Sequence, residues 1–385
     1  MVLAVFLLAL AGKGIASDGP VRATLSYEQT EDRAAFIAAV RKARQGDSEA
    51  QWHVGRTYAG LGADAQALPM LLSAATSGHV SAASLAASFY EDGRGVPKDL
   101  GEALRWYRQA AEQGEPASMA ALARLLPAGD PLVLNYLRRS AEAGDADGQY
   151  QLGLFLARQG PAQNVSEALD WFVKAGKQGH LGAQVASAAH LLEGKGVKAD
   201  RQAGVALLER AARLRDPVAN YLLGQAHLTA GKPDPEAARP PLRVAAMAGH
   251  REAQYLYGTL LAQSKVAEDR REAQEWLEKA QKTGHVVAAN RLGELLRQFE
   301  RDPQQVERAR ALFLQAAEQG NVDAMYNFAV MQNQGLGGPR DTFAALKWFN
   351  RAAEENHERA AEVLEDLLGS TIKTSSLGLK GFWQK

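Results

Sequence analysis

Residues 79–114, HVSAASLAASFYEDGRGVPKDLGEALRWYRQAAEQG, hold one complete copy of the unit from which this chain is built. Apolar residues recur every three to four positions in its first part, which predicts an amphipathic helix. Gly93–Pro97 breaks that helix, because glycine allows left-handed backbone angles and proline cannot continue a helix. Asp99 with Glu102 has the pattern of an N-cap and capping box for a second helix, which ends at Gly114. The stretch therefore predicts a helical hairpin.

The same unit recurs at intervals of 30 to 36 residues. We call its last residue the anchor and number the following positions from it. The anchors are Gly46, Gly78, Gly114, Gly144, Gly179, Arg215, Gly249, Gly284, Gly320 and Asn356. Position nine is always small: Gly55, Ala87, Ala123, Gly153, Ala188, Gly224, Gly258, Gly293 and Ala329. Because glycine inside a helix costs about 1 kcal/mol relative to alanine, its recurrence predicts close contact with the paired helix.

A period of this length predicts an all-α solenoid of about nine helix-turn-helix repeats, each burying its apolar face against its neighbours. The array spans residues 46–356. Residues 31–45 match only the second half of a unit and are expected to form an N-terminal capping helix. Residues 357–369 match only the first half and are expected to form a C-terminal one. There position nine is Glu365, a charge that is tolerated because no second helix follows.

The two ends differ from the array. An apolar run over residues 2–12, followed by Lys13 and small residues, is too short to span a bilayer and fits a signal peptide. We expect residues 1–16 to be that signal, residues 17–30 a linker, and the protein to be periplasmic or secreted. An uncleaved inner-membrane anchor is the alternative, and a buried helix is a third. Residues 370–385 are expected to form a flexible tail, and docking of its Phe382–Trp383 pair stays open.

Composition excludes several classes of function. Lysine and arginine number 44, as do aspartate and glutamate, so nothing predicts the basic stripe that nucleic acid requires. The chain has no cysteine, which excludes disulfides, thiolate metal sites and a lipid anchor on cysteine. No nucleophile motif or phosphate-binding loop occurs. The Gly-x-Gly pairs at 93–95 and 194–196 follow helices and belong to the repeat. We therefore expect no enzyme activity, no cofactor and no metal.

The repeated motifs resemble the Sel-one-like repeat, a relative of the tetratricopeptide repeat. The matching pieces are Gln149–Gly153 (QYQLG), Glu91–Val96 (EDGRGV), Ala344–Phe349 (AALKWF) and Ala316–Gly320 (AAEQG). The resemblance covers residues 46–369 and implies a right-handed superhelix used for protein–protein contact, without catalytic residues. The departures are the short unit that ends at Gly144, the proline-rich stretch 229–241, and Arg215 and Asn356 in place of the glycine that ends the second helix.

Five of the eight histidines directly follow an anchor: His79, His180, His250, His285 and His357. Successive repeats place equivalent residues about 10 Å apart, whereas metal–nitrogen bonds are about 2 Å long. We therefore interpret them as polar caps at the C-terminal ends of helices rather than as metal ligands.

Position six is aromatic in five repeats: Trp52, Tyr150, Tyr221, Tyr255 and Tyr326. In arrays of the tetratricopeptide type this flank of the first helix lines the concave groove. The resemblance therefore implies a ladder of aromatic side chains that grips a partner. The alternative is that these rings fill the core between repeats.

Together these features predict an exported scaffold or adaptor of the cell envelope that binds envelope or secretion proteins on its surface. The alternative is a periplasmic regulator that restrains a membrane sensor or secretion component. An enzyme acting on glycans is a third hypothesis, which the lack of clustered carboxylates or histidines disfavours.

Overall fold

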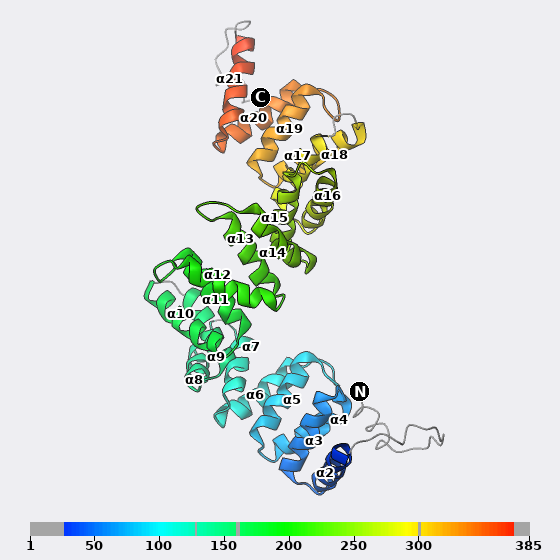
Figure 1. Cartoon of the computed structure of the whole chain (residues 1–385), viewed down its shortest axis with the longest axis vertical. Coiled ribbons are helices and arrows are strands. Elements are labelled where there is room, and N and C mark those ends of the chain that lie inside the picture. The colour runs from blue at the N-terminus through cyan, green and yellow to red at the C-terminus, as the bar shows by residue number, and fades with distance from the viewer. Residues whose placement is uncertain (1–26, 128, 159–161, 299–301, 373–385) are drawn as a thin grey trace, which may run out of the picture. The chain divides into compact units, whose positions relative to one another are not determined.

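A computed structural model describes residues 27–127, 129–158, 162–298 and 302–372, and every regular element in these ranges is a helix. The chain divides into an N-terminal unit, Met1–Asp200, and a C-terminal unit, Arg201–Lys385. Figure 1 labels the helices of both units. In each repeat we call the first helix A and the second helix B. The signal and linker predicted for residues 1–30 lie almost wholly outside the described residues, which begin at Tyr27.

The N-terminal unit begins with α2 (Tyr27–Arg44), followed by alternating A and B helices. Its A helices are α3 (Ser48–Gly60), α5 (Val80–Asp92), α7 (Pro116–Leu125), α9 (Ala146–Arg158) and α11 (Leu181–Glu193). Its B helices are α4 (Asp64–Thr76), α6 (Leu100–Glu112), α8 (Leu132–Glu142) and α10 (Ala162–Lys177). The short predicted unit corresponds to α7 and α8.

The C-terminal unit begins with the B helix α12 (Arg201–Arg213). Its A helices are α13 (Pro217–Leu228), α15 (Arg251–Ala262), α17 (Val286–Arg297) and α19 (Val322–Gln334). Its later B helices are α14 (Pro235–Met247), α16 (Ala267–Lys282), α18 (Pro303–Glu318) and α20 (Thr342–Glu354), and α21 (Glu358–Ile372) follows. The prolines do not break the repeat, since Pro240 and Pro241 lie inside α14 and Leu242 after them is fully buried.

The anchors turn the chain from each B helix into the next A helix. The eight glycine anchors have φ angles from 83° to 94°, and Arg215 and Asn356 adopt φ angles of 60° and 64°. Side chains other than glycine rarely adopt this left-handed region. Each B helix therefore ends in a left-handed residue, also where the anchor is not glycine.

The glycines at position nine lie where the A and B helices of one repeat approach most closely. A Cβ atom on Gly153 would lie 2.5 Å from Cε1 of Phe172, and one on Gly224 would lie 2.4 Å from Cγ of Leu242. Non-bonded carbon atoms prefer separations of about 3.5–4.0 Å. The predicted close contact of the paired helices is therefore confirmed.

Each unit has its core between its helices. In the C-terminal unit one cluster of buried residues extends from Ala238 on α14 to Ala360 on α21. The capping helices are longer than the sequence predicted: α2 begins at Tyr27, and α21 continues to Ile372 through residues 370–372, which we expected to belong to the tail. The rest of that tail, with Phe382–Trp383, lies outside the described residues.

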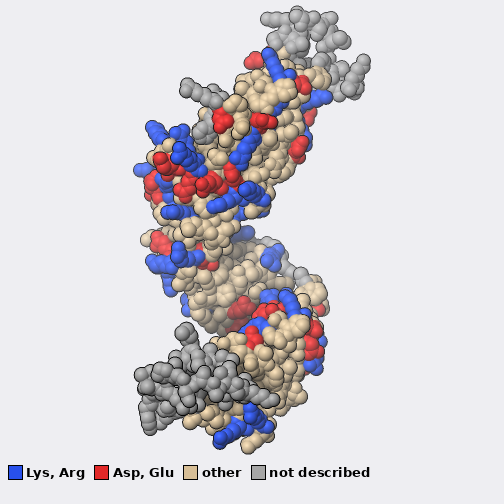
Figure 2. All heavy atoms as spheres, turned by 90° about the vertical axis from the view of Figure 1, so that its right-hand side faces the viewer, with Lys and Arg blue, Asp and Glu red and all other residues tan. Residues whose placement is uncertain are grey.

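The surface mixes charges of both signs. Lysine, arginine, aspartate and glutamate side chains are interspersed on the face that Figure 2 shows. Within the described ranges, no helix is long and apolar enough to cross a membrane.

Candidate functional site

Each of the five aromatic side chains at position six lies against the histidine that begins the next repeat. The distances between ring centroids are 5.1 Å for Trp52–His79, 4.4 Å for Tyr150–His180, 4.4 Å for Tyr221–His250, 4.5 Å for Tyr255–His285 and 4.6 Å for Tyr326–His357. The rings of Tyr221, Tyr255 and Tyr326 are stacked on their histidines at interplanar angles of 19° to 28°, and those of Trp52 and Tyr150 are tilted by 30° and 32°. We call each such junction an aromatic seam. All five position-six rings are half-buried, so each retains an exposed part.

These histidines also cap the A helix that follows them. Nδ1 of His79 accepts a hydrogen bond from the backbone N–H of Ala82 at 3.2 Å. The other four make the same contact at 3.1–3.2 Å, with Ala183, Ala253, Ala288 and Ala360. Because Nδ1 accepts, the ring proton lies on Nε2. The interpretation as C-terminal caps is therefore wrong. The left-handed anchor has already turned the chain, so the imidazole meets the free amides of the next helix.

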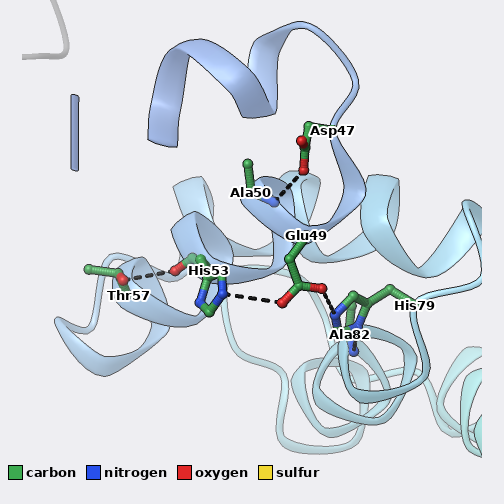
Figure 3. A network of polar contacts seen from close by, with 7 residues as sticks. All are labelled: Asp47, Glu49, Ala50, His53, Thr57, His79 and Ala82. Atoms are coloured by element: carbon green, nitrogen blue, oxygen red, sulfur yellow. Dashed lines mark hydrogen bonds and ion pairs between the residues drawn. The ribbon is translucent and has the colours of Figure 1, made fainter. Parts of the chain in front are cut away.

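An acidic residue at position three completes four of the five seams. Figure 3 shows Glu49, whose carboxylate oxygens lie 3.2 Å from Nε2 of His53 and 3.2 Å from Nε2 of His79. The corresponding separations are 3.7 Å for His180–Asp147, 3.0 Å for His285–Glu252 and 3.6 Å for His357–Asp323. The acid belongs to the preceding repeat, as the aromatic ring does. Ring and carboxylate together therefore hold one histidine across the junction.

The seam at His250 differs from the other four, because Val218 occupies position three of the preceding repeat. Desolvation by burial lowers the pKa of His250, and the nearby Arg251 lowers it further, while Glu252 opposes both. Burial and Glu252 raise the pKa of the stacked Tyr221. This seam therefore holds a histidine that resists protonation.

The pairing of ring and histidine was visible in the sequence, but sequence reasoning missed it. Position six is aromatic in every repeat whose successor begins with histidine. Where the successor begins with Glu115, Asp145, Asp216 or Asn321, position six is Ser84, Ala120, Val185 or Asn290 respectively. The two positions lie about 30 residues apart, so the signal appears only when neighbouring repeats are aligned in pairs.

Two of the other junctions use hydrogen bonds in place of a ring. Ser84 Oγ donates to Glu115 Oε2 at 3.2 Å, and Ser118 Oγ donates to Ser84 Oγ at 2.9 Å. In the C-terminal unit Asn327 Nδ2 donates to Asn290 Oδ1 at 3.0 Å. Positions six and one are thus paired directly at the first of these junctions, whereas at the second Asn290 contacts position seven of the next repeat.

Two further features bear on ligand binding. Among the described residues, no three histidine, aspartate or glutamate side chains converge so as to hold a metal ion. At the short repeat a hollow of about 450 Å³ lies on α7, α8 and α9, lined by Ala123, Arg124, Leu126, Val133, Leu137, Gln151, Leu154, Phe155 and Arg158. Its Arg124 is held by Glu91, with Nη2 to Oε2 at 2.9 Å, and this contact lowers the pKa of Glu91.

The Sel1 repeat family model matches residues 80–115, 146–180, 182–216, 217–239, 251–282, 286–321 and 322–357, which is more than half of the chain. The chain belongs to the Sel1 repeat family. Most of the matched segments begin at the first residue of an A helix, and the segment 217–239 ends just before Pro240–Pro241. Sel1 repeat proteins generally mediate protein–protein interaction. The predicted fold class, an all-α repeat solenoid, is confirmed.

The curated relatives of this Sel1 repeat protein match only parts of it. It is 30% identical over 205 residues to the uncharacterized protein NMB1327 of Neisseria meningitidis, a match that covers 53% of this chain and 43% of that protein. It is also 30% identical over 125 residues to chitin synthase regulatory factor 4 of Schizosaccharomyces pombe, covering 30% and 19% respectively. The chain thus spans less than half the length of these relatives.

Two solved structures share the fold. The protective antigen c5321 of uropathogenic Escherichia coli is 24% identical, with a TM-score of 0.52 and coverage of 86% of this chain and 82% of that one. A Sel1 repeat protein of Oxalobacter formigenes is 23% identical, with a TM-score of 0.53 and coverage of 60% and 96%. At this level of identity the likeness concerns the fold alone.

Proposed function

We propose that this Sel1 repeat protein is an exported scaffold or adaptor of the cell envelope that binds partner proteins along its A helices. The observation that carries the proposal is the set of half-exposed aromatic side chains at position six: Trp52, Tyr150, Tyr221, Tyr255 and Tyr326. Tyrosine and tryptophan are the residues most often found as energetic anchors of interfaces.

The aromatic seams make these rings suitable anchors. Each ring lies against a histidine that is itself fixed by a helix cap, as Tyr255 lies against His285. A ring that is already ordered loses little conformational entropy when a partner covers its exposed part. The same contacts that join the repeats thus prepare a series of rigid contact points.

Export is the second part of the proposal, and it rests on the apolar run at residues 2–12. Cell fractionation and amino-terminal sequencing test it. We expect an envelope protein that lacks residues 1–16. A cytoplasmic product that begins at Met1 would contradict it, and a membrane-bound product that begins at Met1 would indicate an uncleaved anchor.

Site-specific photocrosslinking in the native cell tests the binding surface. A benzophenone amino acid placed at Tyr255 or Tyr326 is expected to capture an envelope protein. The control is the same label at Phe343, which is 54% exposed at the start of the B helix α20. If the label captures a partner at Phe343 but not at Tyr255 or Tyr326, that partner does not bind along the A helices.

A regulatory role is the alternative function. It is supported by the similarity of part of the chain to a protein whose name describes a regulatory factor of chitin synthase. By this alternative the protein restrains a membrane sensor or a secretion component. Crosslinks that disappear when cells receive an envelope stress would favour the regulator, and crosslinks that persist would favour the scaffold.

A further inference from the structure

A turn carries the chain from each B helix into the next A helix. The two residues before the anchor are exposed there and are mostly polar. The residue directly before the anchor is Gln45, Ser77, Gln113, Gln178, Thr283, Gln319 or Glu355 in seven repeats. The residue before that is charged or a threonine in all repeats except the one that ends at Gly249.

Two neighbouring turns of the C-terminal unit break this rule. Leu214 stands directly before the anchor Arg215, and its side chain is 72% exposed. Met247 ends α14, two residues before the next anchor, and is 65% exposed. Val218, at position three after Arg215, is 46% exposed. We call these three residues the turn patch.

The repeat geometry brings the turn patch together. In four other seams the residue at position three lies 3.0–3.7 Å from the histidine that begins the next repeat. Val218 occupies that place before His250, and Met247 precedes His250 by three residues. Leu214 and Val218 flank the turn at Arg215. Equivalent positions in adjacent repeats lie about 10 Å apart, which is close to the rise of two turns of a helix.

Other exposed apolar residues do not form such a patch. Leu100, Leu132, Val266 and Phe343 all lie at the start of a B helix, at most one in each repeat, and so belong to the repeat pattern. Val287 is 41% exposed at position three of another repeat, but the turn before it carries Lys282 and Thr283. The turn patch is the place where exposed apolar residues replace polar ones in two successive turns.

The rim of the turn patch is basic. Arg213, Arg215 and Arg251 are exposed; Arg251 Nε lies 3.7 Å from Glu252, whereas no ion pair of Arg213 or Arg215 is found within the described part of the chain. The two acidic residues nearby are already engaged. Asp216 accepts the backbone N–H of Ala219 as a helix cap, and Glu252 contacts His285 at 3.0 Å. Three arginines thus face two carboxylates, and a partner that covers the patch can pair with Arg213 and Arg215.

We propose that the turn patch binds an amphipathic segment of a partner protein, whose apolar side chains cover Leu214, Val218 and Met247 and whose acidic residues meet the arginines. The positive charge of the rim favours an acidic partner over a basic one. A polypeptide is favoured over a membrane surface, because lipid-binding sequences usually combine about four to eight basic residues. Leu214 and Met247 lie outside the A helices, and Val218 lies in the first turn of the A helix α13. Because the variants below change only Leu214 and Met247 or Arg215 and no position-six ring, their result is independent of the proposed role of those rings.

Peptide binding to the full chain tests the proposal. The probe is a labelled helical peptide of about 18 residues with leucines on one face and glutamates beside them. Two comparison peptides carry lysine in place of glutamate or serine in place of leucine. Fluorescence anisotropy at about 50 mM and about 300 mM NaCl measures binding. We expect the acidic amphipathic peptide to bind more tightly than both others, and more weakly at the higher salt.

Variants place the binding on the turn patch. Leu214→Gln with Met247→Thr restores residue types that sister turns carry and leaves the charge unchanged. We expect it to weaken binding about tenfold. Arg215→Gly removes one rim charge and supplies the usual anchor, and should reduce the dependence on salt. The matched control is Val266→Gln, which removes an apolar residue that is 52% exposed at the start of α16 and should bind as the unchanged chain does.

Several outcomes would overturn the proposal. One is equal binding of the acidic and basic peptides, and another is unchanged affinity in the Leu214→Gln, Met247→Thr variant while circular dichroism shows it folded. Sedimentation of the full chain with anionic phosphatidylglycerol vesicles, abolished by that variant while the acidic peptide shows no binding, would assign the patch to a membrane. Self-association abolished by the same variant would assign it to a second copy of the chain.

Discussion

The seam between Tyr255 and His285 allows the coupling of two repeats to be measured. His285 caps α17 through Ala288 at 3.1 Å, contacts Glu252 at 3.0 Å and stacks on Tyr255 at 4.5 Å, with only 8% of its side chain exposed. A lost N-cap costs about 1 kcal/mol, a lost aromatic stack about 0.5–1.5 kcal/mol, and a lost hydrogen bond about 0.5–1.5 kcal/mol. His285→Ala should therefore lower the free energy of unfolding by about 2–4 kcal/mol.

A double-mutant cycle isolates the stack. Asn321 caps α19 at a junction without an aromatic ring, and Val185 occupies position six of a repeat whose successor begins with aspartate. We therefore combine His285→Asn, which keeps a cap, with Tyr255→Val. The double variant should lose about 0.5–1.5 kcal/mol less than the sum of the single variants. The cycle of Tyr255 with His357, which begins the third repeat after that of Tyr255, should show almost no coupling.

Urea unfolding followed by circular dichroism gives the free energies, and amide hydrogen exchange shows where the change occurs. Exchange resolves single repeats, which matters because a long array need not unfold in one step. The amide of Ala288 should lose protection in His285→Ala and keep most of it in His285→Asn. A coupling below about 0.3 kcal/mol, or equal loss of protection in both variants, would refute the role assigned to the seam.

Three further predictions follow from single sites. Gly153→Ala should lower stability, because the new Cβ would lie 2.5 Å from the buried Phe172 ring, and overpacking costs about 1–3 kcal/mol against about 1 kcal/mol gained in helix propensity. Arg215→Gly should raise the urea midpoint by the equivalent of about 1 kcal/mol, because it relieves the φ angle of 60°. The lowered pKa of His250 means that the unfolded chain binds a proton more readily. The stability that neutral His250 contributes to the folded chain is therefore fully present above a pH of about 6.5. It is lost as the pH falls through the lowered pKa of the folded state. Val218→Asp should raise the pKa of His250, which NMR titration measures. The free energy of unfolding should then decrease less steeply as the pH falls.

Controls distinguish these effects from general damage. Gly60→Ala adds a Cβ to a helical glycine with nothing within 4 Å, so Gly153→Ala should be less stable than it by about 1–3 kcal/mol. Equal stability of the Gly153→Ala and Gly60→Ala variants would show that the Phe172 ring shifts to accommodate the new methyl group at little cost. Asn356→Gly should gain less than Arg215→Gly, because asparagine tolerates left-handed angles. A pH profile that Val218→Asp leaves unchanged would mean that another group controls it.

The sequence predicted the fold because its evidence is local and repeated. The apolar period of each helix and the small residue at position nine recur in every repeat of the array, and glycine is the anchor at all but Arg215 and Asn356. The small residue even predicted the close helix contact that Gly153 and Phe172 make. That the position-six side chains contact a partner protein remains a prediction.

The misinterpreted histidines show where local evidence ends. A residue such as His79 directly after an anchor is equally near to the end of one helix and the start of the next in the sequence. Only the left-handed turn at Gly78 decides that its imidazole caps the amide of Ala82. The position-six pairing was likewise present in the residue types, but two side chains about 30 residues apart meet only once neighbouring repeats are stacked in register.

Residue order alone thus specifies each hairpin, because periodicity, caps and breakers act within a few residues of one another. The stacking of the hairpins decides the rest, because contacts between repeats depend on the register of whole helices. It joins Tyr255 to His285 across a junction and leaves Leu214 and Met247 exposed where polar residues are the rule.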